Sequence, residues 1–242
     1  QNHARIYNEI SNLVAVADSN EEQARKVAEH LDVNWYGDYR EMLDQVDAVT
    51  IAVPTVAHHK VAQKVAGTGI HLLVEKPLAG NCKEAEAIIK ASKESGVTLA
   101  VGHIERYNPI VAYAKEAINR GEWGEIITLF SKRVSSFPDR IHDVGVLFDL
   151  SIHDVDISQY LAGSKVISVY TVGGCIRAEN EDYVISTLEH KSGIISICET
   201  NWLTPHKIRK LEITTSSHFI ELDYIAQSIK VSQSKYIKVD ER

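Results

Sequence analysis

Residues 71–77 read His-Leu-Leu-Val-Glu-Lys-Pro, an apolar run that ends in an acid, a base and a proline. A continuous apolar run is typical of a parallel strand that is covered on both faces. Glu75 and Lys76 would then lie at the carboxyl end of that strand, where open α/β sheets bind their ligands. The stretch therefore predicts a buried parallel strand followed by a functional lysine. A Glu-Lys pair on a surface turn is the plainer alternative, because charged side chains are mostly exposed.

The segments around this strand predict a doubly wound parallel sheet of the Rossmann type over residues 1–102. We expect strands at 13–17, 47–53, 70–74 and 97–102 and helices at 21–31, 56–66 and 83–95. Residues 1–7 look like a helix already under way, so the first strand and the glycine-rich turn of a dinucleotide-binding unit are missing from this sequence. We expect about 20 to 25 further residues to precede it, enough for one strand and its turn.

The pattern changes after residue 102, where β-type runs predominate. We expect strands at 126–134, 166–173, 183–190, 194–200, 211–215, 219–224 and 228–232, and helices at 110–119 and 148–161. This order is typical of an α+β domain built on a mostly antiparallel sheet. The sequence therefore predicts two domains, a dinucleotide-binding domain at 1–102 and an α+β substrate and oligomerisation domain at 103–242.

The composition excludes several classes of protein. A net charge of -7 over 242 residues, without a basic stripe, argues against a nucleic-acid partner. The three cysteines, Cys82, Cys175 and Cys198, are widely spaced, which fits reduced cytosolic thiols better than disulfides or structural zinc. No apolar run approaches the ~20 residues that span a bilayer, and the start does not resemble a signal peptide. We expect a cytoplasmic protein with no membrane partner.

Asp18 directly follows the strand expected at 13–17. An acidic side chain at that place can accept hydrogen bonds from both hydroxyls of an adenosine ribose, so Asp18 and Ser19 are candidate cofactor contacts. A helix N-cap is the alternative, because residues of this type often cap helices. No Lys or Arg follows within several residues to receive a 2′-phosphate, which favours NAD over NADP.

Residues 53–58, Val-Pro-Thr-Val-Ala-His, follow the next expected strand. Proline would turn the chain there and leave small groups to pack against a flat cofactor. Pro54, Thr55 and His58 are therefore candidate cofactor contacts, although a histidine near a helix start more often caps or packs.

Asp149 and His153 lie four residues apart in the helix expected at 148–161. They would share one face, so that the carboxylate could orient the imidazole and favour its charged form. Imidazole titrates near neutrality, which suits a general base. A solvated acidic face is one alternative. A metal site with His142 and Asp143 is another, but it lacks a third fixed ligand, and we expect no metal.

Residues 102–109, Gly-His-Ile-Glu-Arg-Tyr-Asn-Pro, lie where the two predicted domains meet. Pro109 would suit the first turn of the following helix. Arg106 could bind a substrate phosphate through two hydrogen bonds, and an interdomain salt bridge is an equally open alternative.

Taken together, these segments resemble the glucose-fructose oxidoreductase, inositol dehydrogenase and rhizopine-catabolism family of NAD(P)-dependent oxidoreductases, over nearly the whole chain. The Glu-Lys-Pro of that family is matched at residues 75–77, and its Asp-x-x-x-His at Asp149 and His153. Its Pro-Asn-x-x-His loop corresponds to residues 54–58, with Thr55 in place of Asn. Its Arg-Phe-Asn-Pro segment resembles residues 106–109, with tyrosine in place of Phe.

The resemblance implies an enzyme that moves a hydride between a sugar ring hydroxyl and NAD. Lys76 would hold the substrate hydroxyl and neutralise charge that develops on its oxygen. His153 would take the proton, and Asp149 would fix the tautomer of His153. Glu75, like Lys76, would belong to the cofactor side of the site.

Segments 102–109 and 137–146 look most like the nucleotide-sugar dehydrogenases of the family, which implies a substrate such as UDP-N-acetylglucosamine. The candidate substrate contacts are Arg106, Asn108, Arg140 and His142. A free-sugar or inositol dehydrogenase, a lyase or hydrolase that uses NAD transiently, and a non-catalytic NAD-binding regulatory protein are the alternatives. We also expect a homodimer or homotetramer, formed through the exposed face of the second sheet.

Overall fold

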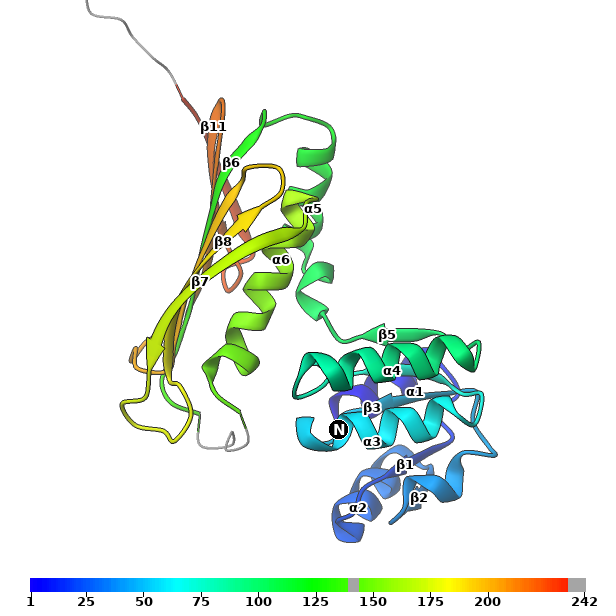
Figure 1. Cartoon of the computed structure of the whole chain (residues 1–242). Coiled ribbons are helices and arrows are strands. Elements are labelled where there is room, and N and C mark those ends of the chain that lie inside the picture. Colours follow the sequence, from blue (N-terminus) through cyan, green and yellow to red (C-terminus); the bar gives the residue numbers. More distant parts are fainter. Residues whose placement is uncertain (139–143, 235–242) are drawn as a thin grey trace, which may run out of the picture. The chain divides into compact units, whose positions relative to one another are not determined.

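The computed structural model describes residues 1–138 and 144–234, and the chain divides into two compact units, Gln1–Gly102 and His103–Arg242 (Figure 1). Each unit has a hydrophobic core of its own. Within the described residues, no helix is both long and apolar enough to cross a bilayer.

The first unit alternates helices and short strands. Its elements are α1 (Asn2–Ile10), β1 (Ala15–Ala17), α2 (Glu21–Leu31), β2 (Asn34–Tyr36), η1 (Tyr39–Met42), β3 (Ala48–Ile51), α3 (Thr55–Ala66), β4 (His71–Val74), α4 (Cys82–Glu94) and β5 (Leu99–Val101). Strand β2 and the 3₁₀ turn η1 were not expected from the sequence. Strand β2 has only three residues, two of them exposed, so it gives no apolar run to recognise.

All the strand pairs of this unit are parallel, in two ladders, β1–β2 and β3–β4–β5. Strand β4 lies between β3 and β5, and its Leu72 and Val74 are buried. Their neighbours include Ala62 and Val65 of α3 and Ile88 of α4, two helices that lie side by side (Figure 1). The parallel sheet predicted for this half of the chain is confirmed.

The second unit begins with two helical segments, and one long strand separates them from the rest. Its elements are η2 (Ile104–Tyr107), α5 (Pro109–Asn119), β6 (Ile126–Val134), the π-helix η3 (Leu147–Ser151), α6 (Ile152–Ala162), β7 (Val166–Gly174), β8 (Tyr183–His190), β9 (Ile195–Asn201), β10 (Ile208–Thr215), β11 (His218–Asp223) and β12 (Ser228–Gln233). The Asn108 side chain caps α5 at its start, directly before Pro109, and α6 ends at Gly163 in the left-handed conformation.

Seven strands form one sheet in the order β12-β11-β10-β6-β9-β8-β7. Only the β6–β9 pair is parallel among them, so the predicted mostly antiparallel sheet is confirmed. Helices α5 and α6 cover one face of this sheet (Figure 1). Leu129 of β6 and Ile213 of β10 pack there against Val111 of α5 and Leu161 of α6. The burial of alternate residues along β8 shows the same two-faced pattern.

The helix expected at 148–161 is in fact two consecutive helical segments. Residues Leu147–Ser151 form a π-helix, in which the hydrogen bonds span five residues, and the α-helix begins at Ile152. The sequence pattern alone does not separate these two geometries. Short π segments are frequent at functional sites, and this one contains Asp149.

Candidate functional site

The Glu75 carboxylate is fixed at the carboxyl end of β4. Its Oε1 atom lies 2.7 Å from Nε2 of His3 on α1, and its Oε2 atom accepts a hydrogen bond of 3.1 Å from the backbone N–H of Lys76. A Cβ atom at Gly102 would lie only 2.9 Å from Oε2. Any residue other than glycine at position 102 would therefore clash with the Glu75 carboxylate. Lys76 is half-buried, and its bond to Pro77 is cis.

His58 joins the loops that follow β3 and β4. The side chain is 1% exposed, with Nδ1 2.8 Å from the carbonyl oxygen of Pro77 and Nε2 2.9 Å from that of Val53. Both ring nitrogens are thus directed at main-chain oxygens. His58 therefore has the packing role that its sequence position left open.

Asp18 is exposed at the carboxyl end of β1, as expected. Its Oδ1 atom accepts a hydrogen bond of 2.9 Å from the backbone N–H of Asn20. Asn20, not Asp18, caps α2, because its side chain accepts a hydrogen bond from Gln23 N. Asp18 therefore stabilises a turn and has its second carboxylate oxygen left for a ligand. Ser19 beside it is exposed.

Apolar side chains are exposed at the carboxyl end of β3. Val53 is 40% exposed and Val56 is 73% exposed, on either side of Pro54 and the buried Thr55. An apolar surface of this kind suits a flat ring, and the exposed Asp18 carboxylate suits a pair of hydroxyls. The residues present therefore fit a dinucleotide.

Asp149 and His153 lie on either side of the junction between η3 and α6. Asp149 is half-buried in the π-helix, and His153, in the first turn of α6, is 9% exposed. The start of η3 is held by Glu181, whose backbone oxygen accepts from Val146 N at 2.8 Å and whose Oε1 accepts from Leu147 N at 3.2 Å. The π-helix that contains Asp149 and leads into α6 is thus capped at its N-terminus.

Arg106 is already paired within the second unit. Its Nε atom donates to Oδ2 of Asp156 at 2.8 Å, a second hydrogen bond reaches Oδ1, and its guanidinium lies 5.3 Å from the ring centre of Tyr160. The hydrogen bonds to Asp156 raise the pKa of Arg106. The ion pair of Arg106 differs from the interdomain salt bridge that the sequence left open, because both of its residues belong to the second unit. Arg106 is therefore engaged by the protein itself.

Asn108 has a local structural role. Its Oδ1 atom accepts from Ile110 N at 3.3 Å as the cap of α5, and its Nδ2 atom donates to Oε2 of Glu105 at 3.3 Å. The other two candidate substrate contacts, Arg140 and His142, lie outside the described residues, as does Asp143. Among the residues that the structure describes, no group of three or more His, Cys, Asp or Glu side chains could hold a metal ion.

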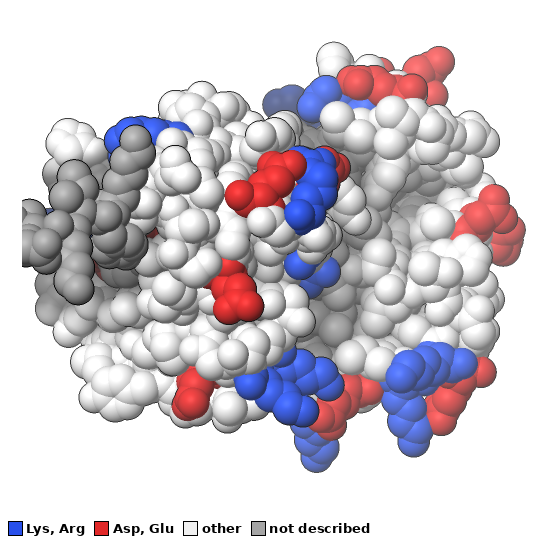
Figure 2. Space-filling view, turned by 90° about the horizontal axis from the view of Figure 1, so that it is seen from above, with Lys and Arg blue, Asp and Glu red and all other residues white. Residues whose placement is uncertain are grey.

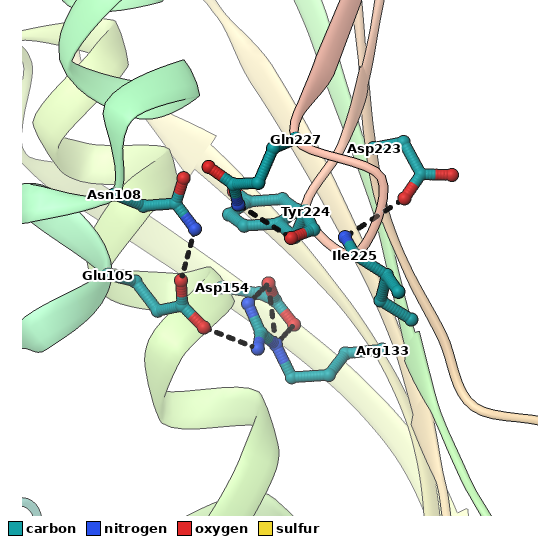
Figure 3. Close-up of polar contacts among 8 residues, drawn as sticks. All are labelled: Glu105, Asn108, Arg133, Asp154, Asp223, Tyr224, Ile225 and Gln227. Atoms are coloured by element: carbon teal, nitrogen blue, oxygen red, sulfur yellow. Dashed lines mark hydrogen bonds and ion pairs between the residues drawn. The ribbon is translucent and has the colours of Figure 1, made fainter.

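A buried ion cluster around Arg133 was missed at the sequence level (Figure 3). Arg133 contacts Asp154 of α6 and Glu105 of η2, with N–O distances of 3.0 and 2.8 Å. A signal was present, because Arg133 continues the alternation of Leu129 and Ser131 on the face of β6 that is turned to the helices. A charge at an expected core position requires a buried partner.

Figure 2 shows acidic and basic side chains of the described residues interspersed on the face that it presents. Large uncharged areas separate them, and no continuous basic area is visible on that face. This distribution agrees with the absence of a basic stripe in the sequence.

Family models match both halves of the chain. The first, an oxidoreductase family with an NAD-binding Rossmann fold, covers residues 1–103, and the second, a GFO/IDH/MocA C-terminal domain, covers residues 111–221. The chain is 30% identical over 229 residues to UDP-N-acetylglucosamine 3-dehydrogenase of Acidithiobacillus ferrooxidans, with 95% of this chain and 72% of that protein covered. It is 34% identical over 218 residues to scyllo-inositol 2-dehydrogenase (NAD(+)) of Bacillus subtilis, with 84% and 64% covered.

Solved structures show the same likeness. A structure of the Acidithiobacillus ferrooxidans UDP-N-acetylglucosamine 3-dehydrogenase matches with a TM-score of 0.87 at 28% identity. The match covers 98% of this chain and 80% of that one. The two-part architecture described above is therefore shared over almost the full length of the chain.

Proposed function

Because this chain belongs to the GFO/IDH/MocA family of NAD-binding oxidoreductases, we propose that it oxidises a sugar ring hydroxyl and that Lys76 and His153 act on that hydroxyl. The two relatives described above, from Acidithiobacillus ferrooxidans and Bacillus subtilis, are named dehydrogenases.

The observation that carries the proposal is the place of Lys76. It lies two residues after the end of β4, the central strand of its ladder, at the carboxyl edge where ligands of parallel sheets bind. Glu75 before it is fixed by His3 and by the space at Gly102, and Pro77 after it is held by His58. Because both neighbours are fixed, the backbone position from which the Lys76 side chain extends is fixed as well. Electrostatic stabilisation by a preorganised charge requires such a fixed position.

The roles of the residues follow from their chemistry. Lys76 places a positive charge beside the substrate oxygen and stabilises the negative charge that develops there as its proton leaves. His153 accepts that proton, which an imidazole can do near neutral pH. Asp149, four residues earlier, orients the imidazole and stabilises its protonated form.

The cofactor contacts of the proposal lie in the first unit. Asp18 and Ser19 bind the ribose hydroxyls. The other end of the cofactor is bordered by Pro54, Thr55, Glu75 and Lys76. The buried His58 ring supports these residues, because its two nitrogens lie close to the carbonyl oxygens of Val53 and Pro77. When bound, NAD supplies the hydride acceptor, while the protein contributes orientation and electrostatics.

A nucleotide sugar such as UDP-N-acetylglucosamine is the substrate that we propose first. Support comes from the named activity of the relative that covers 95% of the chain. Since Arg106 and Asn108 are held by Asp156 and Glu105, the contacts to the diphosphate fall chiefly to Arg140 and His142. Free inositol is the second candidate, because the Bacillus subtilis relative is a scyllo-inositol 2-dehydrogenase.

We further propose a cytoplasmic homo-oligomer. The face of the seven-stranded sheet away from α5 and α6 exposes Tyr170, Val172 and Ile185, which are 72%, 53% and 51% exposed. An apolar face of this kind is typical of an interface between copies. Cys82, Cys175 and Cys198 are free thiols, which agrees with a reducing compartment.

Two single variants test the proposed function. Lys76→Ala and His153→Ala should each lower kcat by ~10² or more and leave the fold intact, as expected for electrostatic and acid-base groups. Lys93→Ala and His30→Ala are the matched controls, because both side chains are exposed in the last turns of their helices, α4 and α2, at the end away from the carboxyl ends of the strands. Native turnover in either of the first two variants would remove that residue from the mechanism.

A further inference from the structure

Arg133 is a buried charge at a core position of β6. Its side chain is 2% exposed, and it lies on the face of the sheet that carries Leu129 and that α5 and α6 cover. A charge in such a place is costly unless ionised and hydrogen-bonded partners surround it.

The charged partners of Arg133 come from two other elements, α6 and η2 (Figure 3). Its Nε atom donates to both carboxylate oxygens of Asp154 at 3.1 and 3.0 Å, and Nη2 donates to Oδ1 at 3.1 Å. Its Nη1 atom donates to Oε1 of Glu105 at 2.8 Å, and Asn108 holds the other oxygen of Glu105. The ring of Tyr224 lies 5.3 Å from the guanidinium carbon. The guanidinium is therefore held in one orientation.

The charges of the cluster are strongly coupled. Burial opposes the charge of Arg133, but the carboxylates of Asp154 and Glu105 outweigh it and raise the pKa of the guanidinium. Burial also raises the pKa of Asp154, against the pull of Arg133. Arg209, the residue opposite Arg133 in the β10–β6 ladder, adds a second positive charge nearby, and burial lowers its pKa. Removal of any one member would leave the others uncompensated.

The ion pairs of this cluster connect α6 to neighbouring elements. Asp154 is the residue after His153, and Asp156, two residues further along, forms a second ion pair, with Arg106. Arg106 and Glu105 both belong to η2, so Asp156 is tied to η2 directly, whereas Asp154 is tied to Arg133 of β6, which also binds Glu105. A planar guanidinium that binds a carboxylate through two nitrogens fixes direction as well as distance.

We propose that Arg133 is a positioning residue for His153: its ion pair with Asp154 fixes the rotation and depth of α6, and so the place of the imidazole. This inference rests on the proposed function, in which His153 accepts the substrate proton. A hydrophobic replacement of a buried ion pair is often as stable as the pair, but it has no preferred direction. Stability and positioning can therefore be separated by mutation.

The first test is Arg133→Lys, which keeps the charge and loses the planar fork. The second is the triple variant Arg133→Met, Asp154→Leu, Glu105→Gln, which replaces the buried charges by uncharged side chains. We expect kcat to fall ~10-fold or more in both, because a small misplacement of a catalytic group has a large effect on rate. We expect KM for NAD to stay within about twofold, and the solvent deuterium isotope effect on kcat to rise as proton transfer becomes limiting.

The matched control removes an ion pair from the other face of β6. Lys132 and Glu199 lie 3.0 Å apart and are partly exposed, so Lys132→Met with Glu199→Leu should leave kcat and the isotope effect unchanged. If the triple variant does not fold, Arg133→Lys decides alone. Native kcat in Arg133→Lys, or a loss of activity in proportion to the loss of folded protein, would overturn the positioning role. Native kcat in His153→Ala would instead overturn the proposed function.

Discussion

The Nδ1 atom of His58 lies 2.8 Å from the carbonyl oxygen of Pro77, so that a buried ring on α3 holds the segment that contains Lys76. The other ring nitrogen lies 2.9 Å from the carbonyl oxygen of Val53. A neutral imidazole can donate to only one of these oxygens, whereas a protonated ring donates to both. The two loops at the carboxyl ends of β3 and β4 are therefore tied through one side chain.

We expect His58→Ala to lower the free energy of unfolding by about 2–4 kcal/mol, because it leaves a cavity and one or two buried carbonyl groups without partners. Denaturant unfolding, followed by circular dichroism, measures this change. His59→Ala is the control, since no hydrogen bond of the described residues reaches the buried Nε2 of His59. An equal loss of stability in the two variants would contradict the role given to His58.

Asp18→Asn separates cofactor binding from turn formation. The amide oxygen of Asn can still accept the hydrogen bond from Asn20 N, so the melting temperature should stay close to that of the native protein. The variant loses the charge and one of the two acceptors for the ribose hydroxyls, and we expect a Kd for NAD that is ~10-fold or more higher. Isothermal titration calorimetry measures it. An unchanged Kd would mean that Asp18 stabilises the turn and does not bind the cofactor.

The three cysteines should differ in reactivity. Cys82 and Cys175 are exposed, whereas Cys198 is buried, and burial raises its pKa to about 11. Because the thiolate is the reactive form, a raised pKa leaves only ~10⁻³ of Cys198 reactive at pH 8. Iodoacetamide should therefore modify two thiols per chain in native protein and three in denaturant, as counted by mass spectrometry. Native modification of Cys198 at the rate of Cys82 would show that the core around it opens.

Gly145 and Glu181 should show strong non-additivity. A Cβ at Gly145 would lie 2.2 Å from the Glu181 carboxylate, which caps Leu147 N at the start of η3. We expect Gly145→Ala to lower stability by about 1–2 kcal/mol through displacement of this cap. In a Glu181→Ala background the carboxylate is absent, so Gly145→Ala should lower the free energy of unfolding much less. Equal costs in the two backgrounds, measured by a double-mutant cycle, would refute the clash.

Much of the fold could be predicted because it follows from apolar periodicity. The bounds of α2, β6 and β8 agree with the expected ranges, and the change from parallel to antiparallel architecture falls where the strand pattern changes. Strand β2 could not be recognised, since Asn34 and Trp35 are exposed. The π-helix at Leu147–Ser151 was also missed, because π and α geometry bury residues with nearly the same spacing.

The sequence predicts which residues of the candidate site lie at strand ends. It does not predict which side chains they pair with. Asp18 and Lys76 lie at strand ends as expected, since position along a strand follows from the sequence. Arg106 was assigned to a phosphate because its partner Asp156 lies fifty residues away in the sequence, and no local pattern links the two. The partners of Arg133 could not be predicted for the same reason, although its alternation with Leu129 and Ser131 along β6 indicates a buried position. Pairing between distant charges requires the tertiary structure.

The most direct test of the account is the oxidation of a nucleotide sugar. Full-length protein with NAD and UDP-N-acetylglucosamine should form NADH in proportion to the sugar consumed, with kcat/KM ~10² or more above that for free N-acetylglucosamine or inositol, from two charged contacts to the diphosphate. Equal efficiency on the free sugars would contradict the nucleotide-sugar assignment. NADH that stops at one equivalent per chain while substrate is still consumed, or no NADH from any sugar, would contradict the proposal that this chain is a sugar dehydrogenase.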